Sequence, residues 1–156
     1  MSDSPATASP TSAGPTDPEF AAALEAMMAM NPNSLLHRMQ IELLEASPER
    51  LVARMPVEGN TQPYGLLHGG ASVVLAETLG SIGSALHAGP HRIAVGLDIN
   101  ATHHRAARSG FVTGTATALS LGNTLASYEI VITDDQDRRT CTCRITCLLR
   151  DAAPGA

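Results

Sequence analysis

An isolated carboxylate and a pair of glycines are the residues of this sequence whose types and spacing best suit chemistry. Glu77 is the single charged residue in an apolar stretch that begins at Gly69 and Gly70. A carboxylate surrounded by Val, Leu and Ala is expected to be desolvated, which suits a general base or a nucleophile. Glycines at the start of a helix leave backbone N–H groups that can polarise a carbonyl oxygen. The pattern predicts attack on a carbonyl group.

Both features also have a purely structural interpretation. Gly69 and Gly70 would then form only a tight turn from a loop into a helix, since glycine adopts conformations closed to other residues. Glu77 would face solvent, because one acid on a helix is common. Spacing alone leaves these alternatives open.

The elements that must position these residues follow from the hydrophobic pattern. Apolar residues recur at helical spacing over residues 69–86, and Gly89-Pro90 ends this run. Alternating or β-rich segments predict two strands before the helix and four after it. The predicted strands cover residues 35–46, 50–57, 92–99, 110–119, 124–133 and 139–149.

This order of elements predicts an α+β fold, in which an antiparallel sheet of about six strands packs around one long central helix. Residues 1–18 hold four of the ten prolines and are expected to form a disordered tail. A domain is expected over residues 19–151, opening with a short helix at 19–29.

Composition excludes several classes of function. The chain has 156 residues and a formal charge of -5, with no Trp and two each of Phe and Tyr, so nucleic acid is not an expected partner. The amino terminus has neither the basic nor the apolar region of a secretory signal. Glu77 and other polar residues interrupt the longest apolar stretch, so no membrane span is expected. We expect a cytoplasmic protein.

Two stretches carry a resemblance to a known family. TQPYGLLHGGASVVLAETLGS and GLDINATHHRAA closely resemble segments of the hotdog-fold acyl-CoA thioesterases. The similar branch contains phenylacetyl-CoA and 4-hydroxybenzoyl-CoA thioesterases and, nearest of all, the 1,4-dihydroxy-2-naphthoyl-CoA thioesterase of menaquinone biosynthesis. The resemblance covers roughly residues 35 to 150 and implies a hydrolase for an aromatic acyl-CoA, in that pathway or in aromatic catabolism.

The resemblance also implies roles for single residues. Glu77 corresponds to the catalytic carboxylate, and the Gly69 N–H to the group that polarises the thioester carbonyl. Gln62 and His68 correspond to supporting polar groups. Ser81 is expected one helical turn beyond Glu77, where it would help to place a water molecule. No cofactor is implied, because CoA is part of the substrate.

Contacts to CoA are expected near the helix start and after the third strand. The resemblance favours His103 and Arg105 near the pantetheine-phosphate path, with Gly70 beside them, and Arg is well shaped to hold phosphate. Asn123 lies where related sequences have a turn close to CoA. An exposed basic turn is the structural alternative for His103 and Arg105.

The spacing of Gly69 and Glu77 predicts a site shared between two chains. Eight residues along one helix separate their backbones by about 12 Å, whereas attack needs the carboxylate or its water within about 3 Å of the carbonyl carbon. We therefore expect Gly69 from one subunit to face Glu77 of the other across a two-fold homodimer. The resemblance suggests a homotetramer of two such dimers.

Other interpretations find less support. Cys141, Cys143 and Cys147 lack a second ligand pair at zinc-site spacing, and their alternation suits the buried face of a strand, so no metal is expected. A non-catalytic acyl-CoA sensor is the alternative function. Release of free thiol from an acyl-CoA would separate an enzyme from a sensor.

Overall fold

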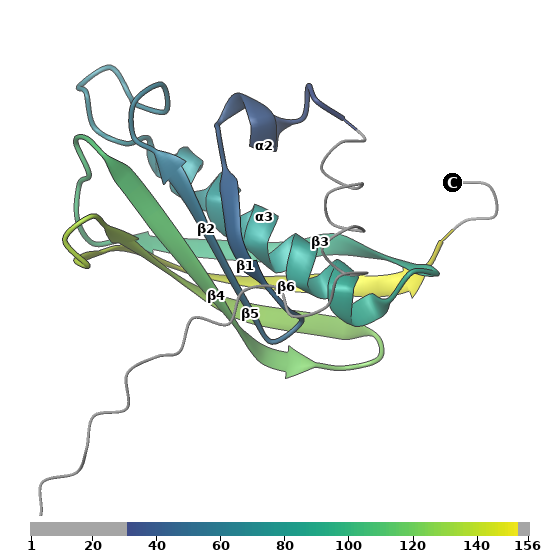
Figure 1. The fold of residues 1–156 in the computed structure, drawn as a ribbon. Coiled ribbons are helices and arrows are strands. Elements are labelled where there is room, and N and C mark those ends of the chain that lie inside the picture. Colours follow the sequence, from purple (N-terminus) through teal and green to yellow (C-terminus); the bar gives the residue numbers. More distant parts are fainter. Residues whose placement is uncertain (1–30, 153–156) are drawn as a thin grey trace, which may run out of the picture.

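The computed structural model describes residues 31–152 (Figure 1). The expected tail at 1–18 and the expected helix at 19–29 lie outside the described residues. The elements are α2 (Leu35–Arg38), β1 (Glu42–Ala46), β2 (Arg50–Pro56), α3 (Gly69–Ala88), β3 (Arg92–His103), β4 (Phe111–Leu121), β5 (Leu125–Asp134) and β6 (Arg139–Asp151).

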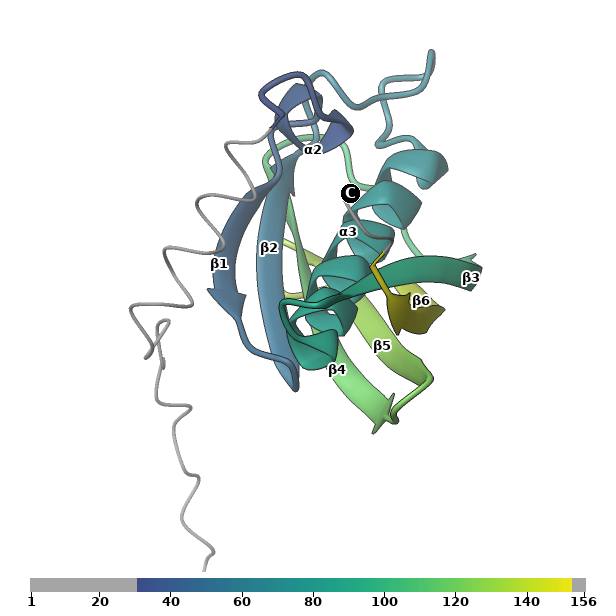
Figure 2. The ribbon, with the colours of Figure 1, turned by 90° about the vertical axis from the view of Figure 1, so that its right-hand side faces the viewer.

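The six strands form a single antiparallel sheet in the order β1-β2-β4-β5-β6-β3. Figure 2 shows α3 crossing the concave face of this sheet, with β1 and β3 at its two edges. One buried cluster joins α3 to the inward residues of the strands. The expected α+β architecture, a six-stranded sheet around one long helix, is confirmed.

Small residues allow α3 to lie close to the sheet. Ile145 fills the space that a side chain at Gly80 would need, and Leu51 and Tyr128 do the same at Gly83. The buried hydroxyl of Tyr128 donates a hydrogen bond of 2.7 Å to the carbonyl oxygen of Pro48, and burial raises the pKa of this phenol. These side chains therefore set the distance between the middle of α3 and the sheet.

The strand predicted over residues 35–46 is wrong in its first part. Leu35–Arg38 forms one helical turn, and the strand begins only at Glu42. The N–H of Met39 closes the turn on the Leu35 carbonyl, and Gln40 follows with a φ of 55°, a left-handed conformation that interrupts a regular extended strand. Local backbone hydrogen bonds therefore make this segment helical, although its short apolar alternation predicts a strand.

The cysteines of β6 face the core, as their alternation predicts. Cys141, Cys143 and Cys147 are buried free thiols. The hydrogen-bonded neighbour Cys141, together with burial, raises the pKa of the Cys143 thiol. These side chains act as small hydrophobic groups of the core.

Edge strand β3 exposes hydrophobic side chains. Ile93, Val95 and Leu97 are exposed by 36%, 39% and 57%, and a register shift between Gly96 and Asp98 interrupts the pairing with β6. Among the described strands, β3 pairs with β6 alone, so its outer backbone edge is open. A long apolar edge of this kind is a surface suited to another chain.

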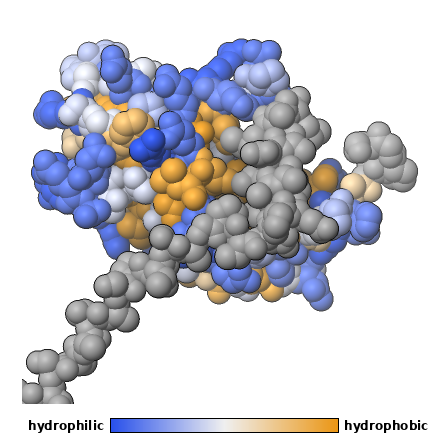
Figure 3. Space-filling model, viewed as in Figure 1, coloured by the Kyte–Doolittle hydropathy of each residue, from blue (hydrophilic) through white to orange (hydrophobic). Residues whose placement is uncertain are grey.

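The face of the molecule seen in Figure 1 mixes polar and apolar areas where it is not covered by the grey residues. Figure 3 shows hydrophobic residues in the middle of the view of Figure 1, surrounded by hydrophilic ones. Within residues 31–152, no helix has the length and hydropathy needed to cross a membrane.

Candidate active site

The side chain of His68, the residue just before α3, caps the first turn of the helix. His68 is the N-cap residue, and its Nδ1 accepts a hydrogen bond of 2.9 Å from the N–H of Gly70. The proton of this neutral imidazole is therefore assigned to Nε2. No hydrogen bond within the described chain uses the N–H of Gly69. The helix start thus offers the Gly69 donor, while His68 occupies that of Gly70.

A pocket of about 260 Å³ lies at this helix start. Its lining includes Gln62, Gly69, Ser72, His103 and Arg105, so it brings together four of the residues singled out from the sequence. The imidazole of His103 covers Gly69: its Nε2 would lie 3.0 Å from a Cβ added there. A side chain at this position would therefore press against the imidazole, and glycine avoids this contact.

A tight turn positions Gln62 in the same pocket. The N–H of Gln62 donates to the Leu66 carbonyl at 2.8 Å, and its carbonyl accepts from Gly65 at 2.9 Å. Gly65 has a φ of 72°, a left-handed conformation that glycine adopts without strain. The half-buried amide of Gln62 is therefore carried on a fixed backbone beside Gly69.

Glu77 lies in a different pocket, of about 130 Å³, two turns along α3. This pocket is lined by Gly96, Leu97, Asp98 and Ile99 of the β3 edge together with Ile145. The carboxylate Oε1 would lie 3.5 Å from a Cβ added at Gly96. Glu77 therefore faces the backbone of β3 at its bulge.

The expectation that apolar neighbours desolvate Glu77 is wrong for the single chain. Glu77 is exposed, whereas Ala76 beside it is fully buried. The helix turns this position toward the sheet edge, and Gly96 has no side chain to cover it.

The two pockets share no lining residue. One chain thus keeps the Gly69 N–H and the Glu77 carboxylate apart, as the helical spacing predicts. Ser81 is half-buried one turn beyond Glu77 and does not line its pocket.

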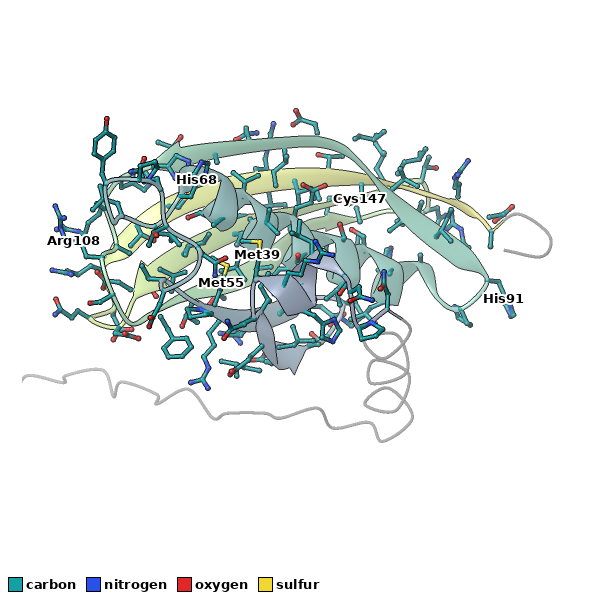
Figure 4. All side chains as sticks on the ribbon, turned by 90° about the horizontal axis from the view of Figure 1, so that it is seen from above. Met39, Met55, His68, His91, Arg108 and Cys147 are labelled. Atoms are coloured by element: carbon teal, nitrogen blue, oxygen red, sulfur yellow. The ribbon has the colours of Figure 1, made fainter. Side chains whose placement is uncertain are left out.

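Asn123 is not brought together with the helix start. Its carbonyl accepts a hydrogen bond from Arg92, and the neighbouring Gly122 carbonyl contacts His87 in the last turn of α3. Figure 4 shows His68 and His91 toward opposite ends of the molecule, and Asn123 lies at the His91 end.

Sequence reasoning missed two polar residues of these pockets. Ser72 is buried one turn after Gly69 and lines the first pocket. Asp98 lines the second pocket next to Glu77. The helical spacing of Ser72 from Gly69 was a usable signal, whereas the bulge that turns Asp98 toward Glu77 leaves none.

Among residues 31–152, no three His, Cys, Asp or Glu side chains converge in a way that could hold a metal ion. The polar groups of the two pockets form separate sets, with donors at Gly69 in one and the carboxylate of Glu77 in the other. The first set can polarise a carbonyl group, and the second can supply a nucleophile or base.

Comparisons with known proteins agree with this chemistry. Residues 64–141 match the family model described as the thioesterase superfamily. The chain is 45% identical over 123 residues to the proofreading thioesterase EntH of Klebsiella pneumoniae, covering 78% of this chain and 90% of that protein.

Solved structures of thioesterases are similar as well. The structure of thioesterase HI1161 from Haemophilus influenzae matches with a TM-score of 0.77 and 38% identity, covering 82% of this chain and 90% of that one. A variant of thioesterase PA1618 from Pseudomonas aeruginosa matches with a TM-score of 0.76 and 39% identity, covering 84% and 94%. The matched residues include Gly69, Glu77 and His103, and the chain belongs to the thioesterase superfamily.

Proposed function

We propose that this protein hydrolyses an aromatic acyl-CoA to the free acid and CoA, with Glu77 and Gly69 as the reacting pair. The observation that carries this proposal is the free Gly69 N–H in a pocket with Gln62 and His103, at a helix start whose next N–H is already capped. A donor held in this way suits an oxygen that gains charge during the reaction.

The chemistry needs one carboxylate and one donor. Glu77 attacks the thioester carbonyl carbon to give a mixed anhydride, while the C–S bond breaks and CoA leaves as its thiolate; water then hydrolyses the anhydride. Alternatively, Glu77 takes a proton from a water that attacks the same carbon. In both routes the Gly69 N–H stabilises the oxyanion. A thiolate is a good leaving group, so neither route requires a strong general acid.

The site forms between two copies of the chain. Gly69 of α3 lies next to His103, the last residue of β3. Glu77 of α3 lies next to Gly96, which is nearer the middle of the same strand. Antiparallel pairing of β3 with β3 of the partner, about an axis near Asn100, would set His103 opposite Leu97. Gly69 of one protomer would then approach the Glu77 pocket of the other. The open β3 edge and its exposed Ile93, Val95 and Leu97 support this homodimer, and two dimers would form the homotetramer.

The aromatic acyl group is proposed from the similarity of the HGG-containing stretch to the naphthoyl-, benzoyl- and phenylacetyl-CoA thioesterases. The likeness to a proofreading thioesterase supports a second role, in which the enzyme clears wrongly acylated thiols and accepts several acyl groups. A panel of acyl groups separates a selective catabolic enzyme from a broad proofreading one.

CoA is proposed to leave the helix start past His103 and Arg105, which line the same pocket as Gly69. Gly70 contributes through its place beside the carbonyl site, since His68 occupies its N–H. Asn123 would reach CoA only from another copy of the chain, because it lies at the far end of α3.

A thiol-release assay over a panel of acyl-CoAs tests the proposal. Wild type should release thiol, and Glu77→Gln should lower kcat by about 10³-fold, in the range of general-base catalysis. Asp98→Asn is the matched control, because it removes a carboxylate from the same pocket and should change kcat by only a few-fold. Tight CoA binding by wild type with no thiol release from any thioester would instead favour the sensor.

Single turnover in ¹⁸O-labelled water distinguishes the two routes. Label that enters the Glu77 carboxylate supports direct attack by the side chain. Label found in the acid product alone, with no mixed anhydride trapped by hydroxylamine, supports activation of water, because water can also open the anhydride at the substrate's acyl carbon and label only the product.

A further inference from the structure

Tyr64 stands apart from the other Phe and Tyr side chains that the structure describes. Tyr128 is buried, and the guanidinium of Arg54 lies 4.7 Å from the ring centroid of Phe111. Tyr64, by contrast, is 84% exposed. A large ring left in water forgoes the free energy of burying its apolar faces. Such a ring is well suited to contact a second molecule.

The turn that carries Tyr64 is fixed by the backbone. The N–H of Gly65 donates a hydrogen bond of 2.9 Å to the Gln62 carbonyl, and this bond closes the turn around Tyr64. Pro63, the residue before Tyr64, has a φ that its own ring fixes. An isolated β-bridge joins the two ends of the segment. The exposed ring is therefore presented from a rigid support, so that little conformational entropy is lost when it is buried.

This turn belongs to the half of the candidate site that holds Gly69. Gln62 and Leu67, on either side of Tyr64, line the same pocket as Gly69 and His103. A surface that faces the Gly69 N–H therefore also lies beside the Tyr64 turn.

The half of the site that holds Glu77 lacks a cover. Glu77 is exposed, and its pocket of about 130 Å³ is lined by Gly96 and Leu97 at the bulge of the open β3 edge. Leu97 is itself 57% exposed. In the pairing of two β3 strands proposed above, His103 lies opposite the partner's Leu97. Tyr64, near the same end of β3 as His103, would then lie against that apolar edge.

We infer that Tyr64 of one protomer covers the Glu77 pocket of the other and keeps bulk water out of it. The inference rests on the proposed function and deepens it, because the partner subunit then supplies an apolar wall as well as the Gly69 N–H. A tyrosine suits this place, since its ring can pack on the exposed Leu97 side chain while its hydroxyl stays in water. Tyr64 is a positioning residue, because it acts on the surroundings of Glu77 and not on the substrate.

Fluorescence tests the burial of this position without any turnover. The chain contains no tryptophan, so Tyr64→Trp introduces a single indole reporter. A single chain leaves the position exposed, so only a covering chain should shift the emission of the folded protein to shorter wavelength than that of the urea-unfolded chain. Acrylamide should quench the folded protein less. Equal emission and equal quenching in folded and unfolded protein, with a dimer verified by sedimentation, would overturn the inference.

Heterodimers show which protomer's Glu77 is covered. In the first, one chain carries both Glu77→Ala and Tyr64→Ser and the other is wild type; in the second, the two substitutions lie on different chains. The first should lose about tenfold in kcat with little change in KM, the size expected when one buried interface aromatic is truncated. The second should match a heterodimer of Glu77→Ala with wild type. The reverse pattern, or equal effects in both heterodimers, would contradict the inference.

Two further variants control for the substitution itself. Tyr64→Phe keeps the apolar faces of the ring and should restore kcat in the first heterodimer. Leu44→Ser, placed there instead of Tyr64→Ser, removes a side chain that is 49% exposed on β1, at the opposite edge of the sheet, and should leave kcat unchanged.

The outcomes also separate this inference from the proposed hydrolysis. If wild type hydrolyses thioesters but the indole of Tyr64→Trp stays exposed in the dimer, the hydrolysis stands and the inference fails. If wild type hydrolyses no thioester but the indole is covered in the dimer, the hydrolysis fails and the contact of Tyr64 with the partner stands.

Discussion

The start of α3 and its middle present two differently built halves of one candidate site. At the start, Gly69 is surrounded by side chains and turns of its own chain: His68 caps the helix, His103 covers the glycine, and Gln62 stands on a fixed turn. Two turns later, Glu77 is exposed at the open edge of the sheet.

This difference shows which of the two reacting groups the single chain holds in position by itself. A backbone donor for an oxyanion must be in place before the reaction, and a single chain can hold it there. A carboxylate gains reactivity when water is removed around it, and in the single chain Glu77 is exposed, so under the proposed function the partner subunit would have to exclude that water. Assembly would therefore complete the half that carries the reactive group.

Mixing two damaged chains is the strongest way to break the comparison. A Glu77→Ala chain and a Gly69→Val chain should each lose about 10³-fold in kcat, because each lacks one half of every site. Heterodimers should recover one intact site each, or about a quarter of the wild-type activity in a random equal mixture. Thiol release is measured after co-refolding, and heterodimers are verified by differently sized tags. Heterodimers with no recovered activity would contradict a site shared between chains.

A matched pair of glycine substitutions sharpens the comparison. Gly69→Ala places a methyl group 3.0 Å from His103 Nε2, where a carbonyl oxygen would bind, and should lower kcat/KM by about a hundredfold. Gly96→Ala meets Glu77 Oε1 at 3.5 Å, an ordinary contact, and should lower it at most about threefold. Steady-state kinetics decides, and similar losses in both variants would show that the two regions do not differ in this way.

The depth of α3 on the sheet connects the two halves, so a change between them tests their coupling. Gly80→Ala puts a methyl group into the space of Ile145, which also lines the Glu77 pocket, and should lower the free energy of unfolding by about 1–3 kcal/mol. Urea unfolding measures this loss. In an Ile145→Ala background, which lacks the Cγ2 methyl that Gly80→Ala would meet, the same substitution should cost less stability; an equal loss in both backgrounds would argue that Ile145 is not the obstacle.

The pH dependence of stability tests the hydrogen bonds between Asp134 and Arg138 in the β5–β6 turn. The pKa of Asp134 in the fold, about 2, lies below its ordinary value of 3.8, so this carboxylate contributes its full stabilisation above about pH 4. That contribution is lost as the pH falls through 2. The difference in Tm between wild type and Asp134→Asn should therefore narrow between pH 4 and pH 2. A constant difference across this range would contradict the role of the Arg138 hydrogen bond.

The sequence predicted the long helix well, because its signals are local. The run of apolar residues from Gly69 and the Gly89-Pro90 stop bracket α3, which ends only two residues later than the predicted 86. The six strands and their antiparallel pairing also follow from alternation and turns, but the place of β3 at the edge, beside β6, does not. The strand predicted at residue 35 failed because four residues of apolar pattern cannot separate one helical turn from a strand.

Exposure of single residues could not be predicted in the same way. Apolar neighbours along α3 suggest a buried Glu77, but only the sheet topology reveals that this face meets an edge strand rather than a central one. The position of Asn123 could not be predicted for a similar reason, since a turn motif carries no information about which end of the helix it adjoins. The sequence also could not predict that Asp98 lines the same pocket as Glu77, because this depends on a β-bulge that only the structure shows.

The twelve-residue β3 strand has a consequence for the newly made protein. Its outer row of backbone donors and acceptors, flanked by Ile93, Val95 and Leu97, would bind any extended peptide that it meets during synthesis. A newly synthesised chain is therefore most prone to aggregation before it associates with a second copy of itself. Slow expression or an abundant chaperone should therefore raise the fraction of this protein recovered in soluble form.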